Sequence, residues 1–221
     1  MTAKPINKVL IVGAGIAGCS TAITLAELGL NVTLIEKQDQ WRFQSSGIFV
    51  YSNGLRSLEK VGVLPQILEA GFAIADGKNV YLDHTGAPIT NVFYPSVSPG
   101  IPPILGIKRS EIHRILAARL ATLGVNIKLA TTVARLNSSD PSAPATVTFN
   151  DGNEEPFDLI VAADGIRSQI RQLIFPEIVP RSTHFGVWRS VHQRPAGLHD
   201  KYMQMGIGKR LGIMPISNDK L

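Results

Sequence analysis

The sequence of 221 residues holds a single cysteine, Cys19, so no disulfide can form within the chain. Charged residues make up only 18% of it, and the net charge of +5 is scattered. No basic run with interleaved aromatic residues occurs, which argues against a nucleic-acid partner. No apolar run approaches the roughly 20 residues of a transmembrane helix. Together with 44% hydrophobic residues, these absences predict a globular protein of the reducing cytoplasm.

Metal-binding and nucleophilic patterns are also missing. The histidines His184, His192 and His199 have neither the spacing of metal ligands nor the partners of a catalytic triad. Cys19 stands at the start of an expected helix, where a small packing residue is more plausible than a nucleophile. We therefore predict no metal site and no thiol chemistry.

The stretch from Lys8 to Lys37 carries the pattern that organises the chain. Lys8–Val12 is short, apolar and rich in β-branched residues, which is typical of a buried parallel strand. The turn Gly13-Ala-Gly15-Ile-Ala-Gly18 follows it directly. A helical segment then runs from Cys19 to Leu28, and a second strand spans Asn31–Glu36. This order predicts a βαβ unit with a dinucleotide fingerprint in its first turn.

Each residue of the fingerprint has a physical reason. Gly13 permits the tight turn, Gly15 leaves room for a pyrophosphate, and Gly18 lets the helix pack closely on the sheet. The N–H groups and the dipole of the helix N-terminus attract phosphate. Glu36 ends the second strand, where it can accept hydrogen bonds from a ribose diol and would repel a 2′-phosphate. The fingerprint alone does not separate FAD from NAD.

The remaining chain mixes helices with a β-rich layer. The pattern predicts a β-hairpin after Phe72 and an amphipathic helix that Ser110 caps and Gly124 ends. The expected helix of residues 54–61 buries Leu55, Leu58 and Val61. The other expected strands are Val125–Leu129, Thr131–Leu136, Ala145–Asn150, Phe157–Ala162, Thr183–His192 and strands within Tyr202–Ile216.

A second motif follows the strand Phe157–Ala162. It reads Asp158-x5-Asp164-Gly165-x-x-Ser168-x-x-Arg171. With the fingerprint and with Arg109 before a helix, it resembles the class A flavoprotein monooxygenases, the aromatic hydroxylases with the para-hydroxybenzoate hydroxylase fold. The resemblance covers nearly the whole chain, and the segment from Gly208 to Pro215 looks most like the subgroup that hydroxylates purines and small aromatic acids.

The resemblance implies a fold class and a division of the chain. The expected α/β fold is a Rossmann-like FAD-binding domain with an inserted β-rich substrate layer, truncated at the C-terminus. The expected parts are residues 1–71 and 104–180 for FAD binding and residues 72–103 and 181–221 for the substrate layer.

The resemblance also implies roles for individual residues. The FAD pyrophosphate would meet the backbone of the first turn, and Asp164 would organise backbone N–H groups and arginine side chains beside it. Glu36 would bind the adenosine ribose with Lys37 beside it, and Arg109 would reach the cofactor from its helix. The implied cofactor-binding residues are Gly13, Gly15, Ala17, Gly18, Glu36, Lys37, Phe49, Arg109, Val133 and Asp164, with Val133 meeting adenine through its backbone.

The implied reaction uses NADH or NADPH to reduce FAD, and O2 to form a flavin C4a-hydroperoxide. This species would hydroxylate a small aromatic or heteroaromatic substrate. Arg210 is the candidate catalytic residue, because it could bind an anionic or carbonyl-bearing substrate; the alternative is an ordinary surface charge. A homodimer is compatible with the resemblance.

Two departures from the family pattern leave alternatives open. The third motif of the family, Gly-Asp, does not occur in this sequence, and Ser45 stands where the family usually has glycine. We therefore expect weak FAD binding and no hydroxylation by this chain alone. The alternatives are an NAD-dependent dehydrogenase, a related flavin-dependent reductase or halogenase, and a truncated, catalytically incompetent FAD-binding fragment.

Overall fold

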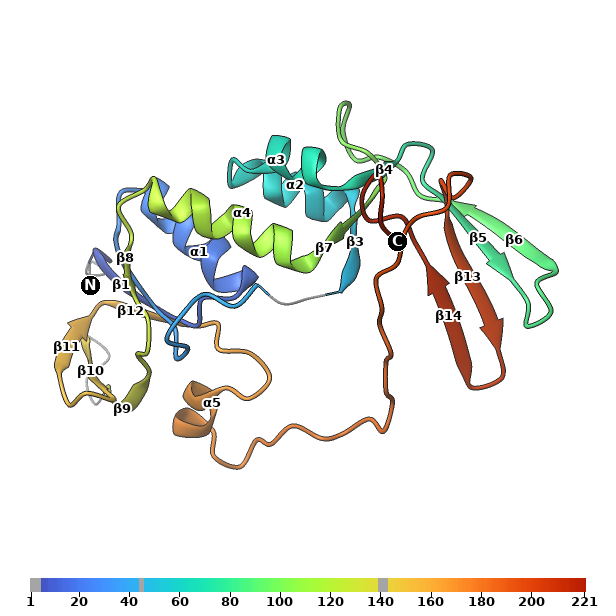
Figure 1. Cartoon of the computed structure of the whole chain (residues 1–221). Coiled ribbons are helices and arrows are strands. Elements are labelled where there is room, and N and C mark those ends of the chain that lie inside the picture. Colours follow the sequence, from blue (N-terminus) through green and yellow to red (C-terminus); the bar gives the residue numbers. More distant parts are fainter. Residues whose placement is uncertain (1–4, 44–45, 139–142) are drawn as a thin grey trace. The chain divides into compact units, whose positions relative to one another are not determined.

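The computed structural model describes residues 5–43, 46–138 and 143–221 (Figure 1). The chain forms two compact units, each assembled from two separate stretches. The first unit comprises Met1–Arg42 and Leu116–Gly186, and the second comprises Phe43–Ile115 and Val187–Leu221. These two units are defined by their compactness and not by function. The division into four functional parts that the sequence suggested stays a prediction.

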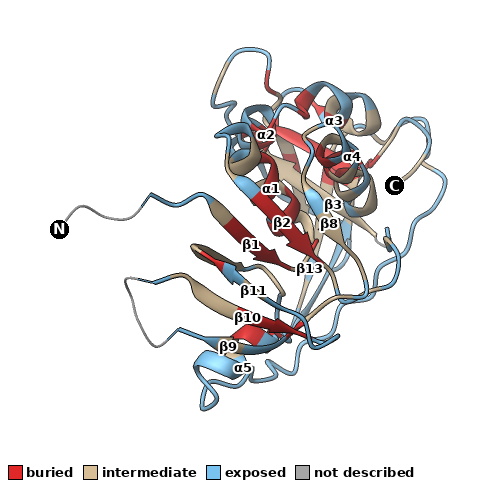
Figure 2. Ribbon diagram, turned by 90° about the vertical axis from the view of Figure 1, so that its left-hand side faces the viewer, coloured by how far each residue is buried: buried red, intermediate tan, exposed pale blue. Residues whose placement is uncertain are grey.

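The first unit is built on a parallel sheet with β1 and β2 at its centre. Figure 2 shows β1 and β2 as buried, which fits their apolar, β-branched sequences. The predicted βαβ unit is confirmed, although its helix begins at Ile16 rather than at Cys19. The sheet order is β12-β1-β2-β8. The elements are β1 (Lys8–Val12), α1 (Ile16–Glu27), β2 (Asn31–Ile35), β8 (Asn126–Lys128) and β12 (Leu159–Ala162).

An antiparallel three-stranded sheet and a short helix complete this unit. The predicted strand pair in this region is confirmed, and a third strand was missed because its acidic, proline-containing sequence does not favour a strand. One core cluster joins both sheets and the helix: Leu10, Val12, Ile35, Val133, Val147, Phe149, Phe157 and Ile170. The elements are β9 (Val133–Asn137), β10 (Ala145–Phe149), β11 (Glu154–Phe157) and α5 (Gln169–Ile174).

The predicted strand Phe157–Ala162 is divided into two. Phe157 ends β11 in the antiparallel sheet, and β12 of the parallel sheet begins at Leu159. Between them, the Asp158 carboxylate accepts hydrogen bonds from the backbone N–H groups of Asn7 and Lys8 at 3.1 and 2.8 Å. Asp158 therefore anchors the chain where it passes from one sheet to the other.

The second unit holds a small antiparallel sheet, two helices and the N-terminal part of a third. The predicted buried face of Leu55, Leu58 and Val61 is confirmed. The boundary between the units falls within α4, which begins at Arg109, so Ser110 lies in the first turn rather than ahead of the helix. The strand order is β3-β7-β4. The elements are β3 (Gly47–Tyr51), α2 (Ser52–Lys60), α3 (Leu64–Ala70), β4 (Phe72–Ile74), β7 (Ile104–Lys108) and α4 (Arg109–Ala121).

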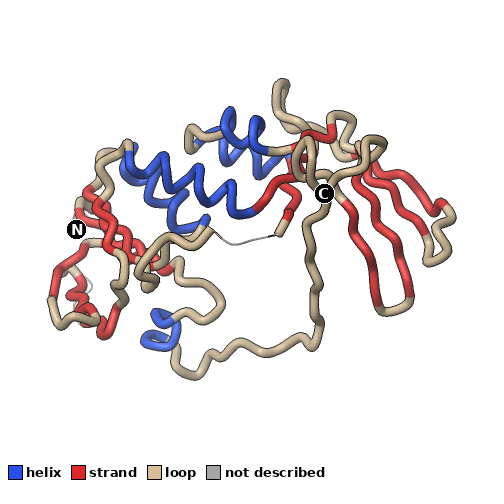
Figure 3. The backbone as a smooth tube through the Cα atoms, viewed as in Figure 1, coloured by secondary structure: helices blue, strands red, loops and turns tan. Residues whose placement is uncertain are grey.

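A four-stranded sheet forms the rest of the second unit (Figure 3). Its strand order is β14-β13-β5-β6, with β13 parallel to β5 and the other neighbours antiparallel. The predicted hairpin at β5–β6 is confirmed, and the strands expected within Tyr202–Ile216 form a second hairpin, β13–β14. The elements are β5 (Lys78–Leu82), β6 (Pro88–Phe93), β13 (Lys201–Gly206) and β14 (Lys209–Ile213).

The prediction of a strand over Thr183–His192 was wrong. This stretch has no regular secondary structure, and the Trp188 side chain is 99% exposed. β-branched and aromatic residues favour a strand only where a neighbouring strand supplies hydrogen bonds and a surface to pack on. Backbone pairing begins only at His192, whose N–H and C=O bond to Leu221 at 3.1 and 3.0 Å. No helix in the described residues is long and apolar enough to cross a bilayer.

Candidate functional site

Two glycines of the first turn are required by the packing of the protein itself. Gly13 has a φ of +100°, and a Cβ there would lie 2.6 Å from the carbonyl oxygen of Ala163. A Cβ on Gly18 would lie 1.9 Å from the carbonyl oxygen of Gly13. The turn can therefore fold against α1 and the Asp164 loop only because these positions lack side chains.

Gly15 differs, because a Cβ at this position would meet no atom within 4 Å. Gly15 is the N-cap of α1, and no side chain of the helix caps its N-terminus. Ala17, in the first turn of the helix, is exposed. The N-terminus of α1 thus borders open space and carries no acidic residue. This arrangement fits a pyrophosphate, which the N–H groups of a helix N-terminus bind.

Glu36 joins the end of β2 to the turn. Its carboxylate accepts a hydrogen bond from the Ala14 N–H and another from the Gln38 N–H, each at 3.0 Å. Each carboxylate oxygen retains a second lone pair, so the group can still accept hydrogen bonds from a ribose. Lys37 beside it is exposed. Glu36 therefore organises the turn, and its binding of a ribose stays a prediction.

Val133 lies close to this edge of the sheet. The Thr131 N–H donates to the backbone carbonyl of Glu36 at 2.9 Å, which holds the start of β9 beside the end of β2. The side chain of Val133 is fully buried in the core. Because the whole residue is buried, its expected backbone contact with adenine stays a prediction.

Asp164 binds the first N–H groups of α5, whose N-cap residue is Ser168. Its carboxylate accepts hydrogen bonds from the Gln169 and Ile170 N–H groups at 2.7 and 3.1 Å. The expected interaction with an arginine is not found for Arg171, whose guanidinium donates to the Ile166 carbonyl instead. Asp164 therefore fixes the loop that packs against Gly13, through backbone N–H groups.

Cys19 serves packing and not thiol chemistry. Burial, together with the nearby charge of Glu36, raises the pKa of the Cys19 thiol to about 12. The thiol donates to the Ala14 carbonyl at 3.3 Å. Because the thiolate is the reactive form, this cysteine is inert near neutral pH.

The other predicted site residues belong to the second unit. Phe49 is half-buried in β3, while Arg109 at the start of α4 and Arg210 on β14 are exposed. The Arg109 N–H donates to the Ser46 carbonyl at 3.2 Å, which ties α4 to the segment before β3. Ser45 lies outside the described residues. The first unit thus brings together the predicted pyrophosphate, ribose and adenine contacts, and the remaining candidates lie in the other unit.

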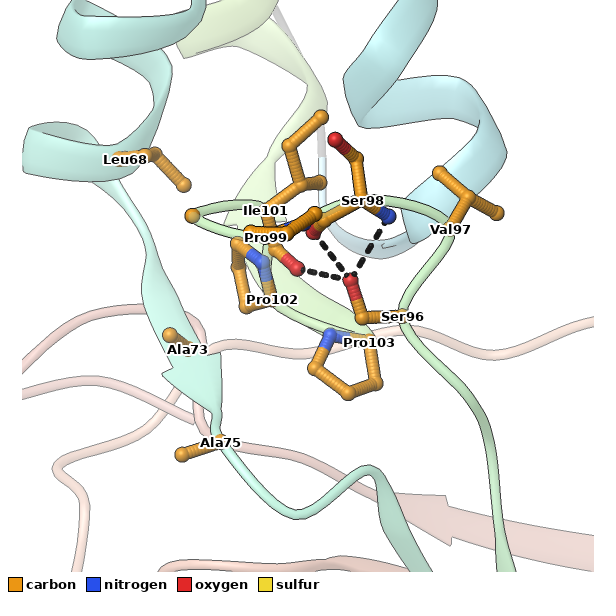
Figure 4. Close-up of a pocket in the computed structure, with 11 residues that line it drawn as sticks. Leu68, Ala73, Ala75, Ser96, Val97, Ser98, Pro99, Ile101, Pro102 and Pro103 are labelled. Carbon is orange, nitrogen blue, oxygen red and sulfur yellow. Dashed lines mark hydrogen bonds between the residues drawn. The ribbon is translucent and has the colours of Figure 1, made fainter.

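A surface hollow of about 630 Å³ in the second unit is not suited to the cofactor (Figure 4). Its walls come from α3, β4 and the loop Ser96–Pro103, and none of the lining residues is charged. The Ser96 hydroxyl lies 2.6 Å from the carbonyls of both Ser98 and Ile101. The hollow therefore offers no group that would bind a pyrophosphate.

Sequence reasoning missed a polar cluster on the four-stranded sheet, centred on Lys201. This lysine is 6% exposed, and its amino group donates to the Tyr51 hydroxyl at 3.1 Å. The alternation within Lys201–Gly206 placed Lys201 on one face with Met203 and Met205. A lysine on a face with two methionines was the only signal in the sequence.

The parallel sheet, the open glycine turn and the carboxylate at the end of β2 define a dinucleotide-binding protein of the Rossmann type. Residues 7–204 match the FAD binding domain family, and the chain belongs to that family. FAD is thus the cofactor that this site is built for, and the resemblance to the N-terminal part of the class A flavoprotein monooxygenases is confirmed.

Curated relatives agree with this assignment. The chain is 33% identical over 213 residues to 2-heptyl-3-hydroxy-4(1H)-quinolone synthase of Pseudomonas aeruginosa strain UCBPP-PA14, covering 95% of this chain and 53% of the relative. It is 27% identical to the aurachin C monooxygenase/isomerase of Stigmatella aurantiaca, covering 94% of this chain and 54% of that protein. The chain thus spans about half the length of these relatives.

Solved structures show the same fold. PqsL of P. aeruginosa in complex with 2-aminobenzoylacetate superposes with a TM-score of 0.82 at 20% identity, covering 97% of this chain and 59% of that one. The tetrameric form of 2-methyl-3-hydroxypyridine-5-carboxylic acid oxygenase gives 0.74 at 22% identity, covering 98% and 57%. The predicted α/β fold class is thereby confirmed.

Proposed function

We propose that this protein is an FAD-dependent monooxygenase that hydroxylates an aromatic or heteroaromatic small molecule with NADH or NADPH and O2. The observation that carries the proposal is the open N-terminus of α1 at Gly15, in a chain of the FAD binding domain family. The names of the relatives support the reaction class, since they include a quinolone synthase and an aurachin monooxygenase. A homodimer and a cytoplasmic location stay predictions of the sequence.

The first unit supplies the binding groups for the adenosine half of FAD. The backbone of Gly13, Gly15, Ala17 and Gly18 would surround the pyrophosphate, with Asp164 fixing the loop behind it. Glu36 would accept hydrogen bonds from the ribose, and the Val133 backbone would contact adenine. When bound to these residues, FAD would supply the oxygen-transfer chemistry. The protein must orient the substrate ring and exclude water from it.

The second unit supplies the surface for the substrate. Phe49 is placed on β3, and Arg210 presents a permanent positive charge on the four-stranded sheet. A guanidinium suits a substrate with an anionic or carbonyl oxygen. Electron-rich rings that bear a hydroxyl group have such an oxygen. Arg109 would add positive charge toward the cofactor.

A flavin titration tests the cofactor assignment. Quenching of FAD fluorescence gives the affinity of the wild-type chain, with NAD in parallel. Gly15→Val would fill the space meant for phosphate, and we expect FAD affinity to fall by at least about tenfold. Gly197→Val is the matched control, because a Cβ at Gly197 also meets nothing within 4 Å. Binding of NAD but not FAD would overturn the proposal.

A further inference from the structure

A buried ammonium group in the second unit has no acidic partner. Lys201 is 6% exposed, and its amino group lies 4.1 Å from the centre of the Phe49 ring and 3.1 Å from the Tyr51 hydroxyl. Among the described residues no carboxylate lies within ion-pair distance of it. The neighbouring acid, Asp200, is paired instead with Lys78 at 2.9 Å. A buried charge without a counter-charge is costly, so a site that keeps one is suited to an anion.

Asn79 provides a second, independent sign of a ligand. Its position in β5 is directly opposite Lys201 in β13, so both side chains project from the same face of the sheet. Asn79 is fully buried, and by distance and angle neither its amide nitrogen nor its amide oxygen has a hydrogen-bond partner among the described residues. Although burial raises the pKa of Tyr81, the Asn79 amide lies close enough to the Tyr81 and Tyr94 hydroxyls to act toward a lower pKa of both phenols. Buried polar atoms are rarely left unpaired in folded proteins. The Asn79 amide can therefore bind a polar group of a ligand next to the Lys201 ammonium.

Three tyrosines surround these two side chains. The rings of Tyr51 and Tyr94 lie 4.9 Å apart, and Tyr81 shares the sheet face of Asn79. Burial raises the pKa of Tyr51 to about 12. Burial also disfavours ionised Tyr94, but hydrogen bonding from Tyr51 and Tyr81, the charge of Lys201 and the nearby Asn79 amide outweigh it and lower the pKa of Tyr94. The surroundings of Tyr94 thus stabilise an ionised phenol.

Arg210 adds positive charge on the same face. Its partner across the hairpin is Met205, which alternates in phase with Lys201. Its charge contributes to lowering the pKa of Lys201, after the larger effect of burial, and it also acts on Tyr81. The side chains facing the cluster therefore carry two positive charges, and no acid from β3, β5, β13 or β14 offsets them among the described residues.

We propose that Lys201, Asn79 and the hydroxyls of Tyr51, Tyr81 and Tyr94 bind the ionised oxygen of an acidic aromatic or heteroaromatic ring, a phenolate or an enolate. The ring hydroxyl gives its proton to solvent, and the oxygen accepts hydrogen bonds beside the ammonium. The inference rests on the proposed function for the identity of the ligand as substrate. Binding itself requires no flavin, because every residue involved lies in the second unit.

The test uses 4-nitrophenol, whose ionised form has a separate visible absorption band. We expect the flavin-free wild-type chain to bind it saturably and to lower its pKa. Lys201→Met should weaken binding of the phenolate by about tenfold, and Lys201→Arg should restore most of it. Arg210→Gln should weaken it by a smaller factor. Lys209→Met is the matched control, since Lys209 is an exposed lysine on the opposite face of the same hairpin.

Several outcomes would overturn the inference. Absence of saturable binding, an unchanged or raised pKa of the bound probe, or equal affinity of wild type and Lys201→Met would each do so. The wild-type measurement remains decisive if Lys201→Met does not fold, which near-ultraviolet circular dichroism shows. Loss of FAD binding with retained nitrophenol binding would count against the proposed function and not against this site.

Discussion

The two units differ in whether their buried or site-forming polar groups are hydrogen-bonded within the protein. In the first, the carboxylates of Glu36 and Asp164 are each held by two backbone N–H groups of the protein. In the second, the Asn79 amide has no partner within hydrogen-bond distance and angle among the described residues. The Lys201 ammonium there donates to the Tyr51 hydroxyl, with no carboxylate beside it among those residues. The carboxylates at the proposed cofactor site are thus held in place by the protein itself. The polar groups at the proposed substrate site remain able to bind a ligand.

This difference has a consequence for the stability of the protein. A polar group that bonds within the protein stabilises the fold, while a buried group left for a ligand destabilises it until the ligand binds. Substitutions of Glu36 or Asp164 in the first unit should therefore lower stability and function together. Substitutions in the proposed anion site should separate the two.

The largest effect is expected from Gly18→Val. The added side chain would overlap the Gly13 carbonyl, which is backbone and cannot move aside. We expect the free energy of unfolding of the first unit to fall by about 3 kcal/mol or more. Urea denaturation measures this, with Gly15→Ala as the control because its Cβ meets no atom. Equal destabilisation by both variants would contradict the packing account.

A smaller effect is expected from the pH dependence of Cys19. The folded chain keeps the thiol protonated to about pH 12, whereas an unfolded thiol loses its proton near its usual value of 9.0. The unfolded state then binds fewer protons, so stability falls as pH rises above 9. We expect Cys19→Ala to remove about 1 kcal/mol of the loss between pH 9 and 10. Identical pH slopes for wild type and variant would show that the thiol is not buried.

The smallest effect on stability is expected from Asn79→Leu, and this variant tests the difference between the two units most directly. Replacing an unpaired buried amide by an apolar group of similar volume should leave stability unchanged or raise it by about 1 kcal/mol. The same variant should bind nitrophenolate more weakly than wild type. A clear loss of stability would mean that the Asn79 amide is satisfied within the fold, and the contrast between the units would then fail.

The sequence predicted what is local. The βαβ unit, the glycine turn and the Asp164 loop depend on residues within a few positions of one another, and all were found. The strand over Thr183–His192 failed because strand formation needs a partner that composition does not reveal. Lys201 and Asn79 were missed because they are far apart in the chain and meet only through the register of β13 on β5. Likewise, no pattern indicated that Arg171 would bond to Ile166 rather than to Asp164.

The most direct test of the account is the FAD titration of wild type and Gly15→Val, with nitrophenol binding measured on the same samples. The account predicts saturable FAD binding by wild type, a loss of at least about tenfold in Gly15→Val, and equal nitrophenol binding by both. Equal FAD affinity of the two proteins would contradict it, because the open space at Gly15 would then not be the pyrophosphate site.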